Sequence, residues 1–247
     1  SLNRFKIESK YKLGRNDTLT MAYDNILSQF GPDYNYEDFF ENHFDVGFSH
    51  SLTRRTALFS GFGYSNRHYP NDRGKDADRY PFRLGLRHAL TRKLWAQFEF
   101  DYEYADYWRS DKTMNNFGGI VDLRYKFGRQ TTGGLRYRYL TMPSWRNHFM
   151  QYRANALEYY TLHNFNKRLS GTGSLMYELQ RDYLYVPSLP AVPKRYTDAA
   201  SAYVALKYKI KEDVDGIVDY GFIKHISDDI TDEYTVNIIS MGVTVVF

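Results

Sequence analysis

The chain has 247 residues, a formal net charge of +4 and no cysteine. No stretch approaches the ~18 consecutive apolar residues of a transmembrane helix, and the lack of cysteine excludes disulfides, a thiol nucleophile and zinc–thiolate sites. The basic residues are scattered along the chain, so a nucleic-acid partner is not expected.

Six short polar turns divide the chain at nearly regular intervals. Each follows a large apolar residue, with spacings of 39, 38, 37, 38 and 45 residues: Leu13, Leu52, Leu90, Phe127, Phe165 and Ile210. A period of this size indicates a repeated supersecondary unit. Longer polar connections lie between the turns and hold all of the prolines except Pro81, which is expected in the first positions of a strand. Each repeat is therefore predicted to be a β-hairpin.

Between the turns the apolar residues alternate with period two, which indicates strands and not helices. The alternation is clearest over 94–104, where Phe98 and Phe100 are interleaved with Glu99, Asp101 and Glu103. In 56–64 and 152–165 the pattern does not show which face is apolar. Strands are predicted near residues 3–13, 18–27, 42–52, 56–64, 80–90, 94–104, 117–127, 133–141, 152–165, 175–181, 202–210, 214–222 and 237–247.

The alternate positions that carry the charged residues decide which face of each strand can be buried. Each unpaired charge in a dry core would cost several kcal/mol, and a soluble barrel of about a dozen strands would be too wide for its side chains to fill. The remaining arrangement turns the apolar face to lipid and the charged face to water, as in transmembrane barrels. We therefore predict an all-β, antiparallel, up-and-down transmembrane barrel that forms one domain over residues 1–247; a soluble sandwich is the alternative.

The last residues, NIISMGVTVVF, continue an alternating apolar series through Val243 and Val245 to Phe247. This ending resembles that of bacterial outer-membrane β-barrels, whose last strand commonly ends in Phe. The resemblance implies a location in the bacterial outer membrane, among lipid and lipopolysaccharide, and it implies that Phe247 belongs to the signal read by the barrel-assembly machinery. Turns of the SLTRRTAL and ALTRKLWA kind resemble, more narrowly, the β-barrel porin type 2 family, which is associated with exopolysaccharide secretion.

The number of strands is unusual for this class. Six tight turns and six longer connections give about 13 strands, whereas single-chain bacterial barrels usually have an even number. We therefore expect a complete barrel of 14 or more strands, with at least one strand supplied from upstream of Ser1 or by another chain. A first strand that does not cross the membrane is the alternative.

The two registers supply the candidate site residues. On the charged side, Arg83 is expected opposite Asp101, and Asp122 opposite Arg136. Candidates for lining a water-filled lumen are Arg83, Arg87, Glu99, Asp101, Glu103, Asp122, Arg124, Lys126, Arg136 and Arg138. Candidates for the lipid-facing side are Phe98, Phe100, Leu123, Tyr125, Val243 and Val245.

These candidates predict a passive channel or export conduit for polysaccharide or small polar solutes, with Trp95 and Tyr203 as sliding contacts for sugars. Three alternatives remain open. The paired charges could form a wall with no role in transport, or the chain could be a structural part of a secretion assembly with periplasmic partners. An outer-membrane hydrolase could use His68 near Asp72, or His225 near Asp228 and Asp229. However, no Gly-x-Ser-x-Gly or His-Glu-x-x-His motif is present, so neither catalysis, a metal nor a cofactor is expected.

Overall fold

The structure, a computed structural model, describes residues 2–29, 38–109, 111–143, 150–184, 196–212, 214–227 and 233–245. Within these ranges no helix is long and apolar enough to cross a membrane. The proposed assembly signal at Phe247 lies outside the described residues, and the side chain of Val245 is likewise not described.

Over the described residues the chain forms thirteen β-strands and one short 3-10 helix, η2, at Arg73–Lys75. The strands are β1 (Leu2–Lys12), β2 (Asp17–Ser28), β3 (Phe39–Ser51), β4 (Thr56–His68), β5 (Ala77–Ala89), β6 (Leu94–Tyr107), β7 (Lys112–Lys126), β8 (Thr131–Pro143), β9 (Met150–Asn164), β10 (Leu169–Leu184), β11 (Tyr196–Lys211), β12 (Val214–Ser227) and β13 (Tyr234–Val245).

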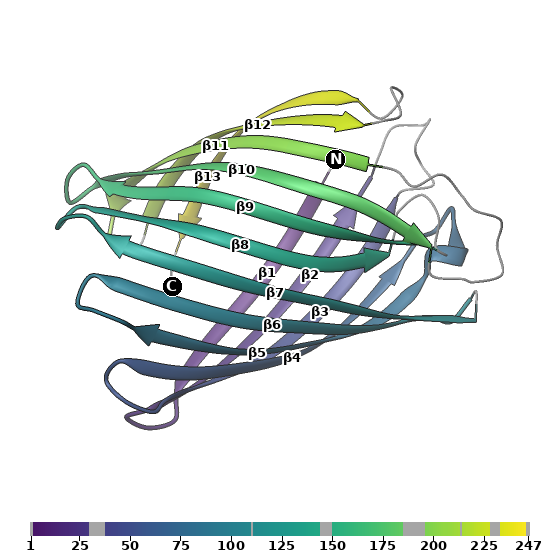
Figure 1. Cartoon of the computed structure of the whole chain (residues 1–247), viewed down its shortest axis with the longest axis horizontal. Helices are drawn as coiled ribbons and strands as arrows, with labels where there is room; N and C mark the ends of the chain where they lie inside the picture. Colours follow the sequence, from purple (N-terminus) through teal and green to yellow (C-terminus); the bar gives the residue numbers. More distant parts are fainter. Residues whose placement is uncertain are drawn as a thin grey trace. The chain divides into compact units, whose positions relative to one another are not determined.

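The strand order in the sheet is the order in the sequence, from β1 to β13 (Figure 1). Consecutive strands pair antiparallel, as in β1 with β2 and β9 with β10. This confirms the prediction of an all-β, up-and-down fold with about 13 strands. A complete barrel of 14 or more strands stays a prediction.

The chain divides into two compact units, which are described separately. Unit 1 comprises residues 1–88 and 98–119, and unit 2 comprises residues 89–97 and 120–247. Unit 1 therefore contains β1 to β4, β5 except its last residue, most of β6 and half of β7. Unit 2 contains β8 to β13 with the last residue of β5 and the remaining ends of β6 and β7. That residues 1–247 form one domain stays a prediction.

A side-chain oxygen holds three of the predicted tight turns in the same way. Thr53, Thr91 and Asn166 each follow the large apolar residue that enters the turn. Each accepts hydrogen bonds from the backbone N–H groups two and three residues further on, at 3.0 and 3.0 Å for Thr53, 3.1 and 3.0 Å for Thr91, and 2.8 and 2.8 Å for Asn166. Such bonds replace ladder partners that the backbone loses in a turn, which explains the recurring turn sequence.

In unit 1 the register separates two faces, since directly paired residues point the same way. Tyr23 pairs with Phe44, and Phe44 pairs with Tyr64. These residues belong to the side that we call the apolar face, together with Phe98 and Phe100, which are 49% and 47% exposed. The opposite side, which we call the charged face, carries the interleaved polar residues.

Unit 2 has the same two faces. Leu123, Tyr125 and Val243 are exposed on the apolar face. The pairing of β8 with β9 assigns the faces of 152–165, one of the two segments that the sequence left open. Leu135 pairs with Tyr159, which places Tyr159 on the apolar face, and the interleaved residues of β9 lie on the charged face.

Strand β5 departs from the prediction at its start. It begins at Ala77, not near residue 80, so Pro81 lies inside the strand and not in its first positions. The described ladder with β4 continues on both sides of Pro81, at Phe62–Phe82 and at Ser65–Arg79. Since Pro81 has no N–H to donate, one ladder bond is absent at this position while the register is kept.

A buried core is small in both units. Among the described residues, the cluster of buried apolar side chains lies in unit 1 and has four members, of which only one is aromatic: Ala77, Ala105, Tyr107 and Met114. Most large apolar side chains are instead exposed on the apolar face. In water this surface would be unstable, so the fold is consistent with lipid against that face.

The two faces should respond differently to a new charge. Phe98→Arg, in the lipid-facing register, is expected to destabilise the folded protein by about 2–4 kcal/mol. Gln97→Arg, one residue away on the charged face, should have a mild effect because the guanidinium can reach water. Urea unfolding of both variants in phospholipid vesicles measures the difference, and equal losses would contradict the assignment of the faces.

Candidate functional site

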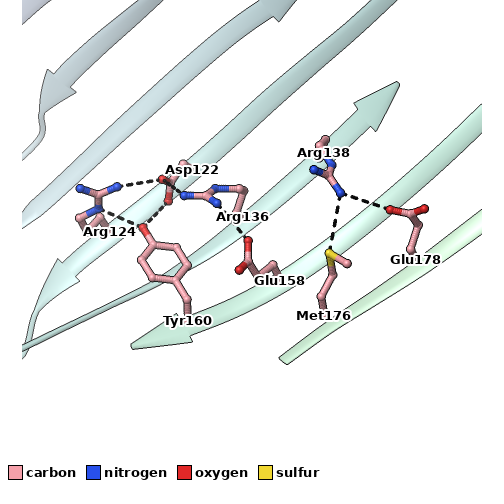
Figure 2. Close-up of polar contacts among 8 residues, drawn as sticks. All are labelled: Asp122, Arg124, Arg136, Arg138, Glu158, Tyr160, Met176 and Glu178. Carbon is pink, nitrogen blue, oxygen red and sulfur yellow. Dashed lines mark hydrogen bonds and ion pairs between the residues drawn. The ribbon is translucent and has the colours of Figure 1, made fainter. Parts of the chain in front are cut away.

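The charged face of unit 2 carries a network of side chains centred on Asp122 (Figure 2). Asp122 and Arg124 come from β7, Arg136 from β8 and Tyr160 from β9. The Asp122 carboxylate accepts a hydrogen bond from the Tyr160 hydroxyl at 2.7 Å and ion-pairs with Arg124 at 3.2 Å and Arg136 at 3.3 Å. Its side chain is only 5% exposed, so three donors compensate for the water that it loses.

A glycine allows Tyr160 to reach that carboxylate. Tyr160 pairs directly with Gly134 on β8, and Asp122 lies one strand further on. A Cβ atom at Gly134 would lie 2.5 Å from Cζ of Tyr160 and 2.8 Å from the carbonyl oxygen of Leu123. The tyrosine side chain can therefore cross β8 because that position has no side chain.

Arg136 extends the network to Glu158 on β9, and the separate contacts that Arg138 makes with β10 are counted with it. Arg136 contacts Glu158 at 3.0 Å, and Arg138 contacts Glu178 at 3.3 Å and the sulfur of Met176 at 3.8 Å (Figure 2). The residue between Arg138 and Glu178 is Ala156, which pairs with both and is small enough to be crossed. Cross-strand pairs of opposite charge contribute about 0.2–1 kcal/mol each.

The charged face of unit 1 has a similar arrangement. Arg83 contacts Glu99 at 2.9 Å and Asp101 at 3.3 Å, and Glu103 accepts a hydrogen bond from Asn116 at 2.9 Å. Acidic residues of β6 are thus held by donors from neighbouring strands, and water-exposed guanidinium groups remain on the surface.

One arginine of this face lies over an aromatic ring. The guanidinium of Arg87 is 6.0 Å from the centroid of the Phe59 ring. That ring lies against Gly85 on β5, where a Cβ atom would come within 2.1 Å of it. As at Gly134, a residue without a side chain lets a large ring lie along the strands.

All ten predicted lumen residues fall in the charged-face register. The structure places Arg83 in contact with Asp101 and Arg136 in contact with Asp122, and it places Arg138 in contact with Glu178. Lys126 is the last residue of β7, next to a tight turn. That these residues line a water-filled lumen stays a prediction.

Sequence reasoning missed three members of the network, Glu158, Tyr160 and Glu178. The alternation over 152–165 is weak because Tyr159 and Tyr160 are adjacent, so period two alone does not assign the face. Ala154 and Ala156 of β9 are both buried on the charged face. Two alanines spaced two residues apart could therefore have been used to assign that face from the sequence. Small residues there mark the places where side chains of neighbouring strands cross.

The histidines considered for a hydrolase have structural contacts. His68 lies 3.0 Å from Asp76 and not beside Asp72, the predicted neighbour, which instead contacts Lys75 at 3.5 Å. Asp76 is fully buried and also accepts a hydrogen bond from the backbone N–H of Tyr69 at 2.7 Å. This carboxylate therefore anchors the connection between β4 and β5.

The ring of His225 stacks on Tyr234 with centroids 4.6 Å apart, while Asp228 and Asp229 lie outside the described residues. Within the described part of the chain, no group of three or more histidine and acidic side chains is placed to hold a metal ion.

Comparison with solved structures identifies the fold class. The chain is similar to a loop L8 deletion mutant of OmpT, an outer-membrane protein of Vibrio cholerae, with a TM-score of 0.56 and 12% identity over 98% of this chain and 89% of that one. It is also similar to the outer-membrane channel DcaP of Acinetobacter baumannii, with a TM-score of 0.54 and 12% identity over 97% and 83% of the two chains. For the NanC porin the TM-score is 0.51 and the identity 10%, over 84% and 94%.

The fold is therefore that of outer-membrane β-barrel porins, and it supports the predicted location in the bacterial outer membrane. No protein-family model matches the chain. A comparison with curated protein sequences also finds no match. The narrower resemblance to the β-barrel porin type 2 family stays a prediction.

The passage of the Tyr160 side chain over Gly134 can be tested by substitution. Gly134→Ala should destabilise the protein by roughly 1–3 kcal/mol, because the new methyl group overlaps both the Tyr160 ring and a backbone oxygen. Gly242→Ala is the matched control, since it lies in the charged-face register of β13 and a Cβ atom there would meet nothing within 4 Å. Urea unfolding in vesicles measures both, and a neutral Gly134→Ala would show that the ring is free to move away.

Proposed function

We propose that this chain forms a passive outer-membrane channel for small polar solutes, with sugars as the preferred class. The observation that carries the proposal is the separation of the faces: one face exposes large apolar side chains, and the other carries arginines and carboxylates that remain partly open to water. A barrel wall of this kind holds a polar passage in lipid. The porin-like fold supports the same function.

The balance of charge on the charged face favours uncharged polar solutes. In unit 2 the three arginines of the network are matched by three carboxylates, Asp122, Glu158 and Glu178. Such a surface offers hydrogen-bond donors and acceptors side by side and no strong field of one sign. Sugar hydroxyl groups can use both. Tyr160 and Tyr203 add aromatic surface on the same face.

Polysaccharide export is the narrower form of this proposal. It is supported by the resemblance of the turns and by a wall that suits sugars. A structural role in a secretion assembly predicts instead a protein that does not conduct, and the experiments below measure conduction.

Liposome swelling tests the preference for sugars. Vesicles that contain the refolded protein should swell at measurable rates in neutral mono- and disaccharides, and the rate should fall with solute size as in a water-filled pore. Vesicles without protein give the background. Swelling no faster than this background would contradict the channel.

Planar-bilayer recording tests the wall itself. Arg138→Gln removes a positive charge from the charged face, so the reversal potential under a KCl gradient should shift toward cation selectivity. Arg153→Gln is the matched control because Arg153 lies on the apolar face of the neighbouring strand β9. It should leave the reversal potential unchanged. Equal shifts for both variants, or none for Arg138→Gln, would contradict the assignment of the lumen wall.

A further inference from the structure

Positive charge recurs at one position of the tight turns. In five of the six turns the second residue after the entering apolar residue is basic, and in the sixth it is acidic. All six of these residues are exposed: Arg15, Arg54, Arg92, Arg129, Lys167 and Glu212. The net charge of the whole chain is only +4, so the tight turns hold more positive charge than the composition suggests.

In unit 2 the backbone joins neighbouring turns to one another. The N–H of Lys126 donates to the carbonyl oxygen of Lys93 at 2.8 Å, and the N–H of Lys209 donates to the carbonyl oxygen of Arg168 at 2.7 Å. Adjacent hairpins are two strands apart, which is about 9–10 Å. The cations at their tips therefore form a row that an extended chain can span and a small anion cannot. We call the exposed cations of these turns the basic rim: Arg92, Lys93, Arg129, Lys167 and Arg168.

A hollow of about 260 Å³ lies at the basic rim, where the turn at 164–169 meets the adjoining ends of β11 and β12. Its volume is near the lower end of the ~300–1,000 Å³ that is typical of small-molecule sites. Four cations and two carboxylates are among its lining residues: Lys167, Arg168, Lys207, Lys209, Glu212 and Asp215. The excess of positive charge favours an anionic group in this hollow.

One carboxylate of the hollow lies between two lysines. Asp215 is opposite Lys209 in the register of β11 and β12, but it forms its ion pair with Lys207, at 2.7 Å. The register shifts directly after Lys209, before Lys211, and bulges at the rims of barrels redirect side chains in this way. The Lys207 side chain remains 49% exposed. Its ammonium group is therefore still within reach of a ligand.

A second hollow, of about 580 Å³, adjoins the first and shares Asn164, Asn166 and Lys167 with it. Gln130 and Phe165 complete its lining. The amide side chains offer both donors and acceptors to hydroxyl groups, and the Phe165 ring, which is 51% exposed, offers an aromatic surface. Groups that suit a sugar ring thus lie directly beside a cation.

The first hollow is continuous with the wall of the proposed channel. Its lining residue Ser170 pairs with Lys207, and four residues further along β10 Ser174 pairs with Tyr160 and Tyr203. A separation of four residues keeps side chains on the same face of a strand, so this hollow lies on the charged face. It therefore opens toward solutes in the channel and not toward lipid against the apolar face.

We propose that the basic rim and its two hollows bind carboxylate-bearing sugar chains at the periplasmic end of the channel, where the short turns of outer-membrane barrels lie. Carboxylates of the chain would pair with the cations, and its hydroxyl groups would bind the amides. Because one chain can meet several turns at once, its affinity would exceed that of a single pair. The balanced network around Asp122 lies further along the strands, so neutral sugars would pass the wall without being held at the rim. This inference rests on the proposed function and adds acidic sugars as the class that the rim retains.

Calorimetric titration of the refolded protein in detergent micelles tests the proposal. The probes are hexagalacturonate and maltohexaose, a neutral sugar chain of the same length, which should bind roughly tenfold more weakly. Lys167→Gln and Arg168→Gln should each weaken hexagalacturonate binding about threefold, as expected for one exposed ion pair. Glu212→Gln removes a competing carboxylate and should strengthen it by a similar factor. Lys224→Gln, which removes a positive charge from the apolar face of β12, is the matched control and should leave the affinity unchanged.

Further measurements separate the possible outcomes. Hexaglutamate, an acidic peptide, should bind more weakly than hexagalacturonate, and equal affinities would indicate a peptide partner and overturn the proposal. Equal binding of the acidic and neutral sugar chains, or wild-type affinity in both Lys167→Gln and Arg168→Gln, would also overturn it. Glu212→Gln keeps the test available if variants with fewer cations do not refold. Bilayer conductance without binding of hexagalacturonate would contradict this inference alone, whereas binding without conductance would contradict the channel.

Discussion

Each strand of this protein faces two surroundings at once, and the rest of the structure depends on that constraint. A single-layer sheet has no second layer to bury its side chains, so the apolar cluster of unit 1 is small and large residues such as Phe98 remain exposed. The hydrophobic effect then stabilises the fold only if lipid covers the apolar face, while the charged face needs water. Apolar and polar residues therefore alternate along each strand. The tight turns keep this alternation in register from one hairpin to the next.

On the charged face, small residues decide how the large ones lie. Gly134 and Ala156 let Tyr160 and Arg138 extend across a neighbouring strand to carboxylates on the strand beyond. Side chains that lie along the wall in this way are held by hydrogen bonds and ion pairs and do not project freely from it. The same contacts stabilise the sheet and provide the mixed donor and acceptor surface on which the proposed channel depends.

The apolar face has different chemistry at the two ends of the hairpins. Near the tight turns, histidines contact polar residues of the adjacent strand, as in His50 with Asp17 at 2.7 Å and His88 with Thr56 at 2.9 Å. Near the long connections, tyrosine hydroxyl groups instead donate hydrogen bonds to Asn or Asp side chains of the next strand, as in Tyr137 with Asn155 at 2.6 Å and Tyr220 with Asn237 at 2.7 Å. An apolar band with polar, aromatic borders suits a membrane with two unlike surfaces, and it gives the sheet a defined depth in lipid.

The strands, the tight turns and the two faces were predictable from the sequence, because the side-chain direction in a strand has period two and a turn needs particular residues. Charge partners two strands apart were not. The sequence pattern placed Asp122 and Arg136 opposite each other, but it did not place Glu178 with Arg138, and it left the faces of 152–165 open. Local alternation is a property of each strand alone, whereas a contact across an intervening strand depends on the register of three strands and on the size of the residue being crossed. Only the tertiary structure decides these.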